Sequence, residues 1–285
     1  MSTAALRDRD PNHPDGLGAG PIGDALTSSP DAETAPARTF PAAEADWARI
    51  KASERRRMLL PTLLLMTFAT GVIDAVSYLA LGSVFTANMT GNVVLIGFAF
   101  GGVPGFSITR TCVAVAGFAT GSAISGRLSR RWRRHPFIWV RRATAIEIVL
   151  LALAALGSIG LATGIDVDDE PQRYAVIGLL AIAMGMRNAT MRRLGFTDVP
   201  TTVLTSTITD FASDSRFGGG EQRRQGRRAA AIVAMATGAL VGALLVRHVD
   251  AQAGFAMAIG LLLVAAAHQA LIARRHPRDS GAARP

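Results

Sequence analysis

The sequence contains one cysteine, Cys112, and lacks the common signatures of catalytic sites. A single cysteine excludes an internal disulfide framework and a cysteine-rich metal site, and we expect Cys112 to be a small buried hydrophobe. The patterns HExxH, GxSxG, the Walker loop and paired cysteines are missing, and the five histidines are scattered along the chain. We therefore expect no enzymatic activity, no bound metal and no cofactor.

Apolar residues, by contrast, are abundant and come in blocks, each about as long as the ~20 residues that cross a bilayer core. The blocks are residues 59–81, 108–128, 143–163, 174–191, 229–246 and 254–273. They are interrupted mainly by Gly, Ser and Thr, which membrane helices tolerate. The sequence therefore predicts an all-α integral membrane protein, whose first partner is the lipid bilayer.

The net charge of +9 comes largely from arginines that cluster at the ends of these blocks. In a soluble chain this charge would indicate nucleic acid, but here it indicates membrane topology, so no nucleic-acid partner is expected. Residues 1–46 are rich in Pro, Ala, Gly and Asp and are predicted to form a disordered cytoplasmic tail. Residues 47–58 are predicted to form an interfacial basic helix, and residues 274–285 a second cytoplasmic tail.

The positive-inside rule predicts which apolar stretches cross the membrane. Arginines precede the first block, and seven more lie in residues 127–142, so both regions are expected in the cytoplasm. Three apolar stretches lie between them, and an even number of crossings requires that one does not cross. We predict that residues 84–101, which begin with a run of Thr and Asn, form a re-entrant segment that enters from outside. Residues 199–213 have basic flanks on both sides and are predicted to be re-entrant from inside.

An internal sequence match supports this order of elements. Gly71 and the pair Asp74-Ala75 recur as Gly185 and Asn188-Ala189, and the polar run that follows recurs in degraded form. The predicted fold therefore has six transmembrane helices plus two re-entrant half-helix segments, arranged as an inverted-topology repeat. Its halves are residues 59–164 and 172–273, joined by an external acidic loop at residues 165–171, with both termini cytoplasmic.

Small residues recur at every fourth position in two of the predicted spans. They are Gly117, Gly121 and Ser125 in the block 108–128, and Ala234, Gly238 and Gly242 in the block 229–246. Stripes of this kind allow helix backbones to approach closely. We therefore predict two tightly packed helix faces, one in each half.

Polar residues within the membrane region are the candidate substrate-binding residues. They are Asp74, Asn88, Thr90, Asn92, Asn188, Thr202, Thr205 and Thr207. An acid within a span needs a partner or a wet cavity, so Asp74 is either a coupling or substrate-orienting group or a structural hydrogen-bond partner for the polar loop that follows. The Asn and Thr side chains have two interpretations. They either cap unpaired backbone N–H groups at the starts of the two half-helices, or they line a binding site in which the partial positive charge of the half-helix N-termini attracts an anion or the acceptor groups of a polar solute.

Three further polar residues have ordinary interpretations. Glu147 lies close to Arg141 and Arg142 in sequence and is expected to pair with them at the membrane interface. Arg187 is either a counter-charge for Asp74 or a side chain that extends to the interface. His268 is expected to be interfacial.

The stretch that begins at Gly71 carries a recognisable motif. It reads Gly-x-x-Asp-Ala-x-Ser-Tyr-x-x-x-Gly and is followed, from Phe85 to Asn92, by Phe-x-x-Asn-Met-Thr-Gly-Asn. With these motifs the sequence resembles the YoaK family of bacterial inner-membrane proteins, over roughly residues 55–275. The resemblance implies a multi-pass membrane protein and implies no substrate, cofactor or mechanism.

We therefore expect a transporter or channel for a small polar or anionic solute in the bacterial cytoplasmic (inner) membrane. The alternative is a non-transporting regulatory or scaffold protein, or a lipid-modifying membrane enzyme. A continuous polar cavity between the two re-entrant segments would favour transport, and a dry, close-packed meeting point would favour the alternative. The sequence leaves open whether the chain forms a homo-oligomer.

Overall fold

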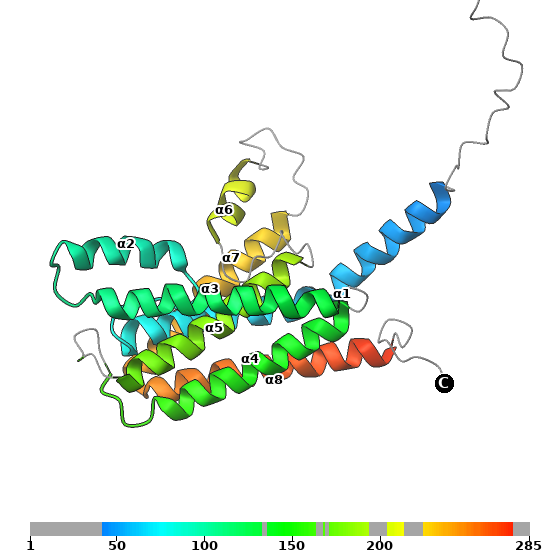
Figure 1. Cartoon of the computed structure of the whole chain (residues 1–285). Coiled ribbons are helices and arrows are strands. Elements are labelled where there is room, and N and C mark those ends of the chain that lie inside the picture. Colours follow the sequence, from blue (N-terminus) through cyan, green and yellow to red (C-terminus); the bar gives the residue numbers. More distant parts are fainter. Residues whose placement is uncertain are drawn as a thin grey trace, which may run out of the picture. The chain divides into compact units, whose positions relative to one another are not determined.

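All regular structure in the computed structural model is α-helical over the residues that it describes, which are 42–132, 136–163, 168, 171–193, 204–213 and 225–275. Six helices are long: α1 (Ala42–Ala80), α3 (Ile108–Arg131), α4 (Pro136–Gly157), α5 (Pro171–Arg193), α7 (Gln225–His248) and α8 (Ala251–Arg275). Two are short: α2 (Met89–Phe100) and α6 (Leu204–Ser213) (Figure 1). The predicted all-α class is confirmed, and α1 continues without a break through the predicted boundary at residue 58.

Four of the long helices are long and apolar enough to cross a bilayer. These segments are Met58–Ala80, Pro171–Arg193, Gln225–His248 and Ala251–Arg274. In α7 and α8 only 17% and 28% of the apolar window is buried within the protein, and Leu240 and Leu263 are exposed. Apolar surface on this scale is unfavourable in water and favourable against lipid tails. The protein is therefore a membrane protein.

The remaining long helices are α3 and α4, and α4 carries three charged residues close together, Arg141, Arg142 and Glu147. Helix α4 begins at Pro136 rather than near residue 143, so that Arg141 and Arg142 belong to its first turns. Proline suits the first position of a helix, and arginine has a high helix propensity, so the helix extends beyond the apolar block into the basic segment.

The two short helices coincide with the two segments that were predicted to be re-entrant. Helix α2 has 12 residues and α6 has 10. At 1.5 Å per residue they are about 18 Å and about 15 Å long. Because a bilayer core is about 30 Å thick, neither helix can cross it alone.

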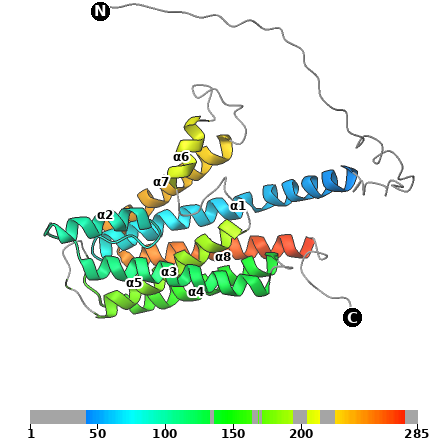
Figure 2. The ribbon, with the colours of Figure 1, turned by 45° about the horizontal axis from the view of Figure 1, so that its top comes forward.

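The small-residue stripes make the tightest helix contacts, between α3 and α5 and between α1 and α7. A Cβ atom at Gly121 would overlap the carbonyl of Ile182, and one at Gly185 would overlap the carbonyl of Phe118. The backbones of α3 and α5 therefore touch over this stretch, and the two helices lie side by side in Figure 2. Both predicted tightly packed faces are present.

The contact between α1 and α7 repeats this arrangement. A Cβ atom at Gly238 would overlap the carbonyl of Phe68, and one at Gly71 would overlap the carbonyl of Met235. In both helix pairs, the carbonyl that faces a glycine belongs to the residue three positions before the partner's own glycine. The two pairs thus share the same reciprocal contact.

Cys112 is exposed on α3, so the prediction that it is buried was wrong. The buried face of α3 follows Ala114, Gly121 and Ser125, and Cys112 lies outside that row. Because Gly121 needs contact with α5, the packing of the small residues determines which face of α3 turns inward.

Buried polar contacts join the helices at one end of the bundle. The guanidinium group of Arg173, at the start of α5, donates hydrogen bonds to the carbonyl oxygens of Ala80 (3.3 Å) and Ala162 (3.0 Å). It therefore pairs with a carbonyl group that the C-terminal end of α1 leaves without a helical partner, and a positive charge is also favourable at this end of a helix. Gln252 of α8 donates to Ser158, just after α4 (2.8 Å). The end of α1, the end of α4 and the starts of α5 and α8 therefore lie together.

A second set of contacts joins helices through Thr190 of α5. The indole Nε1 of Trp139 donates to its hydroxyl (3.1 Å), and the Ser125 hydroxyl lies 3.0 Å from the same oxygen. The half-buried ring of His268 contacts the Thr62 hydroxyl at 2.8 Å. These contacts hold α3, α4 and α5 together, and α1 against α8.

Candidate functional site

The motif that begins at Gly71 builds the irregular connection between α1 and α2. After Ala80 the chain reverses through Gly82 and Ser83, whose φ angles of 89° and 55° lie in the left-handed region. Glycine adopts this conformation readily, which explains its place in the motif. The carboxylate oxygen Oδ1 of Asp74 then accepts hydrogen bonds from the backbone N–H groups of Thr86 (3.1 Å) and Ala87 (2.9 Å).

The remaining motif residues complete the same connection. The Asn92 amide bonds both backbone groups of Phe85: its Oδ1 accepts from the N–H group (3.0 Å) and its Nδ2 donates to the carbonyl (2.6 Å). Asn88 is the N-cap of α2 and accepts from the N–H group of Gly91. The rings of Phe85 and Tyr78 stack, with their centroids 4.8 Å apart. Side chains therefore satisfy backbone groups of the loop between α1 and α2, which no helix pairs.

This geometry bears on the two interpretations of Asp74. Its side chain is buried, and Oδ1 is engaged by the loop. These contacts are those of the structural interpretation, in which Asp74 holds the loop. Asn88 and Asn92 likewise have the capping contacts that the structural interpretation requires.

The other predicted site residues do not gather around Asp74 as one group. Thr90 is exposed, Asn188 is half-buried, and Thr207 is buried with no hydrogen-bond partner for its hydroxyl among the described residues. Thr202 and the side chain of Thr205 lie outside the described residues.

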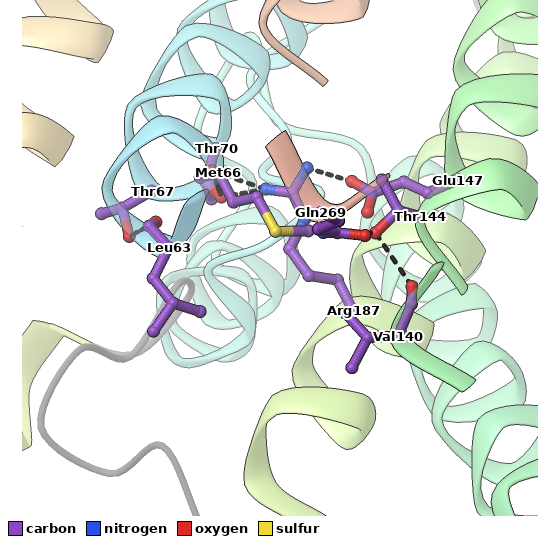
Figure 3. Close-up of polar contacts among 9 residues, drawn as sticks. All are labelled: Leu63, Met66, Thr67, Thr70, Val140, Thr144, Glu147, Arg187 and Gln269. Carbon is purple, nitrogen blue, oxygen red and sulfur yellow. Dashed lines mark hydrogen bonds and ion pairs between the residues drawn. The ribbon is translucent and has the colours of Figure 1, made fainter. Parts of the chain in front are cut away.

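A buried polar centre lies instead between α1, α4 and α5 (Figure 3). Arg187 of α5 forms an ion pair with Glu147 of α4 through Nη2 and Oε1. Its Nη1 donates to the carbonyl of Met66 (2.7 Å) and to the hydroxyl of Thr70, both on α1. Arg187 and Glu147 are each 2% exposed. Because Glu147 lies near the middle of α4 and Thr70 near the middle of the apolar segment Met58–Ala80 of α1, the centre lies near mid-depth of the bundle.

The expectation that Glu147 pairs with Arg141 or Arg142 at the interface was therefore wrong. A charge at mid-depth is costly unless it has a partner, and Arg187 supplies that partner from another helix. Arg187 does not extend to the interface either. The acid that it pairs with directly is Glu147 and not Asp74.

Polar contacts continue from this centre toward α8. Thr144, one turn before Glu147, donates to the carbonyl of Val140 (3.0 Å) and accepts from Nε2 of Gln269 on α8 (3.2 Å). Both Thr144 and Gln269 are buried. The centre thus receives residues from α1, α4, α5 and α8.

Sequence reasoning missed this polar centre, although it named Glu147 and Arg187 individually. The available signal was that both are charged residues within apolar blocks, where each needs an opposite charge. Pairing the two was the missing step, because they are 40 residues apart and the contact depends on how α4 packs against α5.

Comparison with known proteins agrees with the motif. No solved structure matches this chain significantly. Over 155 residues the chain is 32% identical to the UPF0700 transmembrane protein YoaK of Bacillus subtilis (strain 168), a match that covers 53% of this chain and 65% of that protein. Residues 62–268 match the family described as "Protein of unknown function (DUF1275)". The resemblance to YoaK is confirmed, and the chain belongs to this family of membrane proteins of unknown function.

Proposed function

We propose that the protein is a transporter of a small polar or anionic solute in the bacterial cytoplasmic membrane, and not an enzyme. The observation that carries the proposal is the buried polar centre. It combines Thr70 and Glu147 from the first half of the chain with Arg187 and Gln269 from the second. Transporters built from inverted repeats bind their substrates near mid-membrane, at the interface between the repeats.

The proposed topology has six crossings, by α1, α3, α4, α5, α7 and α8, with α2 and α6 as re-entrant half-helices. In it, α1–α4 and α5–α8 are inverted copies. Two observations support this arrangement. The half-helices occupy equivalent places in the two halves, and the glycine contacts of α1 with α7 match those of α5 with α3. Under the repeat, each of these two pairs is the counterpart of the other.

Arg187 is the proposed contact for the solute. Its Nε is buried and has no hydrogen-bond partner among the described residues, so one N–H donor at the centre is available. An anionic group could pair with the guanidinium in place of Glu147, since both offer oxygen acceptors. Rocking of one half against the other about the glycine contacts would then expose the centre to each side in turn.

The test is an uptake screen in proteoliposomes of the full chain, with a panel of small anions and zwitterions. The variant Glu147→Gln/Arg187→Met removes the charge pair without leaving one charge unpaired, so it should fold and lose uptake. Arg192→Met is the matched control, because Arg192 is an exposed arginine on the same helix, and it should transport like the wild type. Uptake by a folded double variant at the wild-type rate would refute the proposed role of the centre.

A second candidate is a non-transporting regulatory or scaffold protein. It is favoured by the loop after α1, where Asp74 and Asn92 serve backbone groups. The two candidates differ in the screen, because a scaffold would give no saturable uptake of any solute.

A further inference from the structure

A pocket of about 410 Å³ opens between α4 and α8, next to the buried centre, with which it shares Gln269. Its polar lining consists of Arg141 and Arg142 of α4 and Gln269 of α8. The rest of its lining is apolar and includes Ile138 and Ala270. An open pocket with a charged part and an apolar part suits a ligand with the same division.

The two arginines are available to a ligand. Both are exposed, and among the described residues neither has an acidic partner. The guanidinium carbon of Arg142 lies 3.9 Å from the centre of the Trp132 ring, which orients the group and leaves its edge N–H donors free. Adjacent guanidinium groups provide several donors in the geometry that phosphate oxygens favour.

Gln269 provides a buried acceptor without a partner. The hydroxyl proton of Thr144 is committed to the carbonyl of Val140, so Thr144 can only accept from Gln269. The amide of Gln269 must therefore present Nε2 to Thr144, which leaves its Oε1 without a partner. The side chain is 4% exposed, and a buried carbonyl oxygen of this kind favours a ligand that carries an N–H or O–H donor.

The surface that continues from the pocket is apolar. On α4 the exposed residues Val149 and Leu153 follow the pocket residues at four-residue spacing, and on α8 the exposed Leu263 and the partly buried Ile259 precede them on the same helix face. Gln252 near the start of α8 contacts Ser158 just after α4, so these two helices are antiparallel. Both apolar rows therefore run from the pocket toward the same end of the bundle, as acyl chains beside a bound headgroup would.

We propose that this pocket binds a membrane phospholipid. The phosphate lies against Arg141 and Arg142, a headgroup N–H or O–H donates to Gln269, and the acyl chains lie along α4 and α8. The lipid source is favoured over a free phosphate compound because the apolar rows give the acyl chains a surface. This proposal does not depend on transport, since its phosphate contacts, Arg141 and Arg142, lie outside the polar centre and lipid binding requires no movement of the two halves.

The test measures lipid binding to the purified full chain in detergent by native mass spectrometry. The lipids are dioleoyl phosphatidylethanolamine, whose headgroup donates hydrogen bonds, and dioleoyl phosphatidylcholine, whose headgroup has no N–H. The soluble competitors are glycerol 3-phosphate and inorganic phosphate. We expect tighter binding of the ethanolamine lipid and no displacement by either soluble compound at millimolar concentration.

Two variants locate the site. Arg141→Gln/Arg142→Gln should weaken binding of both lipids about tenfold or more, as expected for losing charge-assisted hydrogen bonds. Arg130→Gln/Arg131→Gln is the matched control, since it removes two exposed arginines from the end of α3, outside the pocket. Gln269→Met should retain binding but lose the preference for the ethanolamine headgroup.

Each contrary result refutes a part of the proposal. Equal losses in the two double-arginine variants would mean general attraction between basic protein and lipid, and no site. Displacement by glycerol 3-phosphate would assign the pocket to a soluble phosphate compound. Equal affinity of the wild type for both lipids would remove the role of Gln269.

Discussion

Glu147→Gln should destabilise the protein far more than the loss of an exposed charge would. The change keeps the size of the side chain, but it leaves Arg187 as a buried cation with no counter-ion in direct contact. Removing one partner of a buried ion pair lowers the free energy of unfolding by about 3–5 kcal/mol. Arg187→Met should cost a similar amount, because it leaves the carboxylate of Glu147 buried without its partner.

The double variant Glu147→Gln/Arg187→Met should be more stable than the sum of the two single changes indicates. No unpaired charge remains in it, and the acceptors of Arg187 retain other donors, since the Thr70 hydroxyl itself donates to the carbonyl of Met66 (2.9 Å). Neutral replacement of a buried pair is often tolerated, so we expect a coupling free energy of about 2–4 kcal/mol between the two positions.

Equilibrium unfolding in mixed dodecylmaltoside and SDS micelles, followed by tryptophan fluorescence, measures all three variants. Arg192→Met is the control and should lie within about 0.5 kcal/mol of the wild type, as exposed substitutions usually do. Single variants that match this control would refute the buried pair. Strictly additive costs would show that the two side chains do not interact.

Three further predictions concern the packing, the loop and the helix ends. Gly238→Ala should lower the free energy of unfolding by about 1–3 kcal/mol in the same assay, because the new Cβ atom would overlap the backbone of α1. Gly260→Ala should be neutral or stabilising, because no atom lies within 4 Å of the new Cβ atom. Asp74→Asn keeps an oxygen for the two N–H groups and should fold, whereas Asp74→Ala should cost roughly 2–4 kcal/mol; if Asp74 couples transport to an ion, only wild-type uptake would depend on pH. Arg173→Met should speed hydrogen–deuterium exchange at the end of α1, and unchanged exchange there would contradict its capping role.

The helices of this protein follow from local sequence patterns. Runs of apolar residues long enough to cross a bilayer predict spans, and the run of Thr and Asn from Thr86 onward predicts a break before α2. The stripe around Gly121 predicts a close helix contact, although sequence alone does not say which helix lies opposite. These features depend on residues near one another in the chain, which is why sequence reasoning reached them.

The polar centre depends on contacts between distant residues. Sequence spacing places Glu147 near Arg141 and Arg142, but its partner Arg187 comes from another helix. Cys112 shows the same limit, because the packing of α3 against α5 decides which face of α3 is buried. The role of Asp74 stayed open in the sequence, and its contacts with Thr86 and Ala87 became visible only with the loop in three dimensions.

The inverted six-span arrangement is tested most directly by labelling single cysteines in a Cys112→Ala background. Val103, Asp168, Arg131 and Arg274 are exposed positions in four different parts of the chain. With a membrane-impermeant maleimide applied to intact spheroplasts, Val103→Cys and Asp168→Cys should be labelled. Arg131→Cys and Arg274→Cys should react only after the membrane is opened. Labelling of Arg131→Cys together with Asp168→Cys in intact spheroplasts would contradict the account, because it would place both ends of α4 on the same side of the membrane.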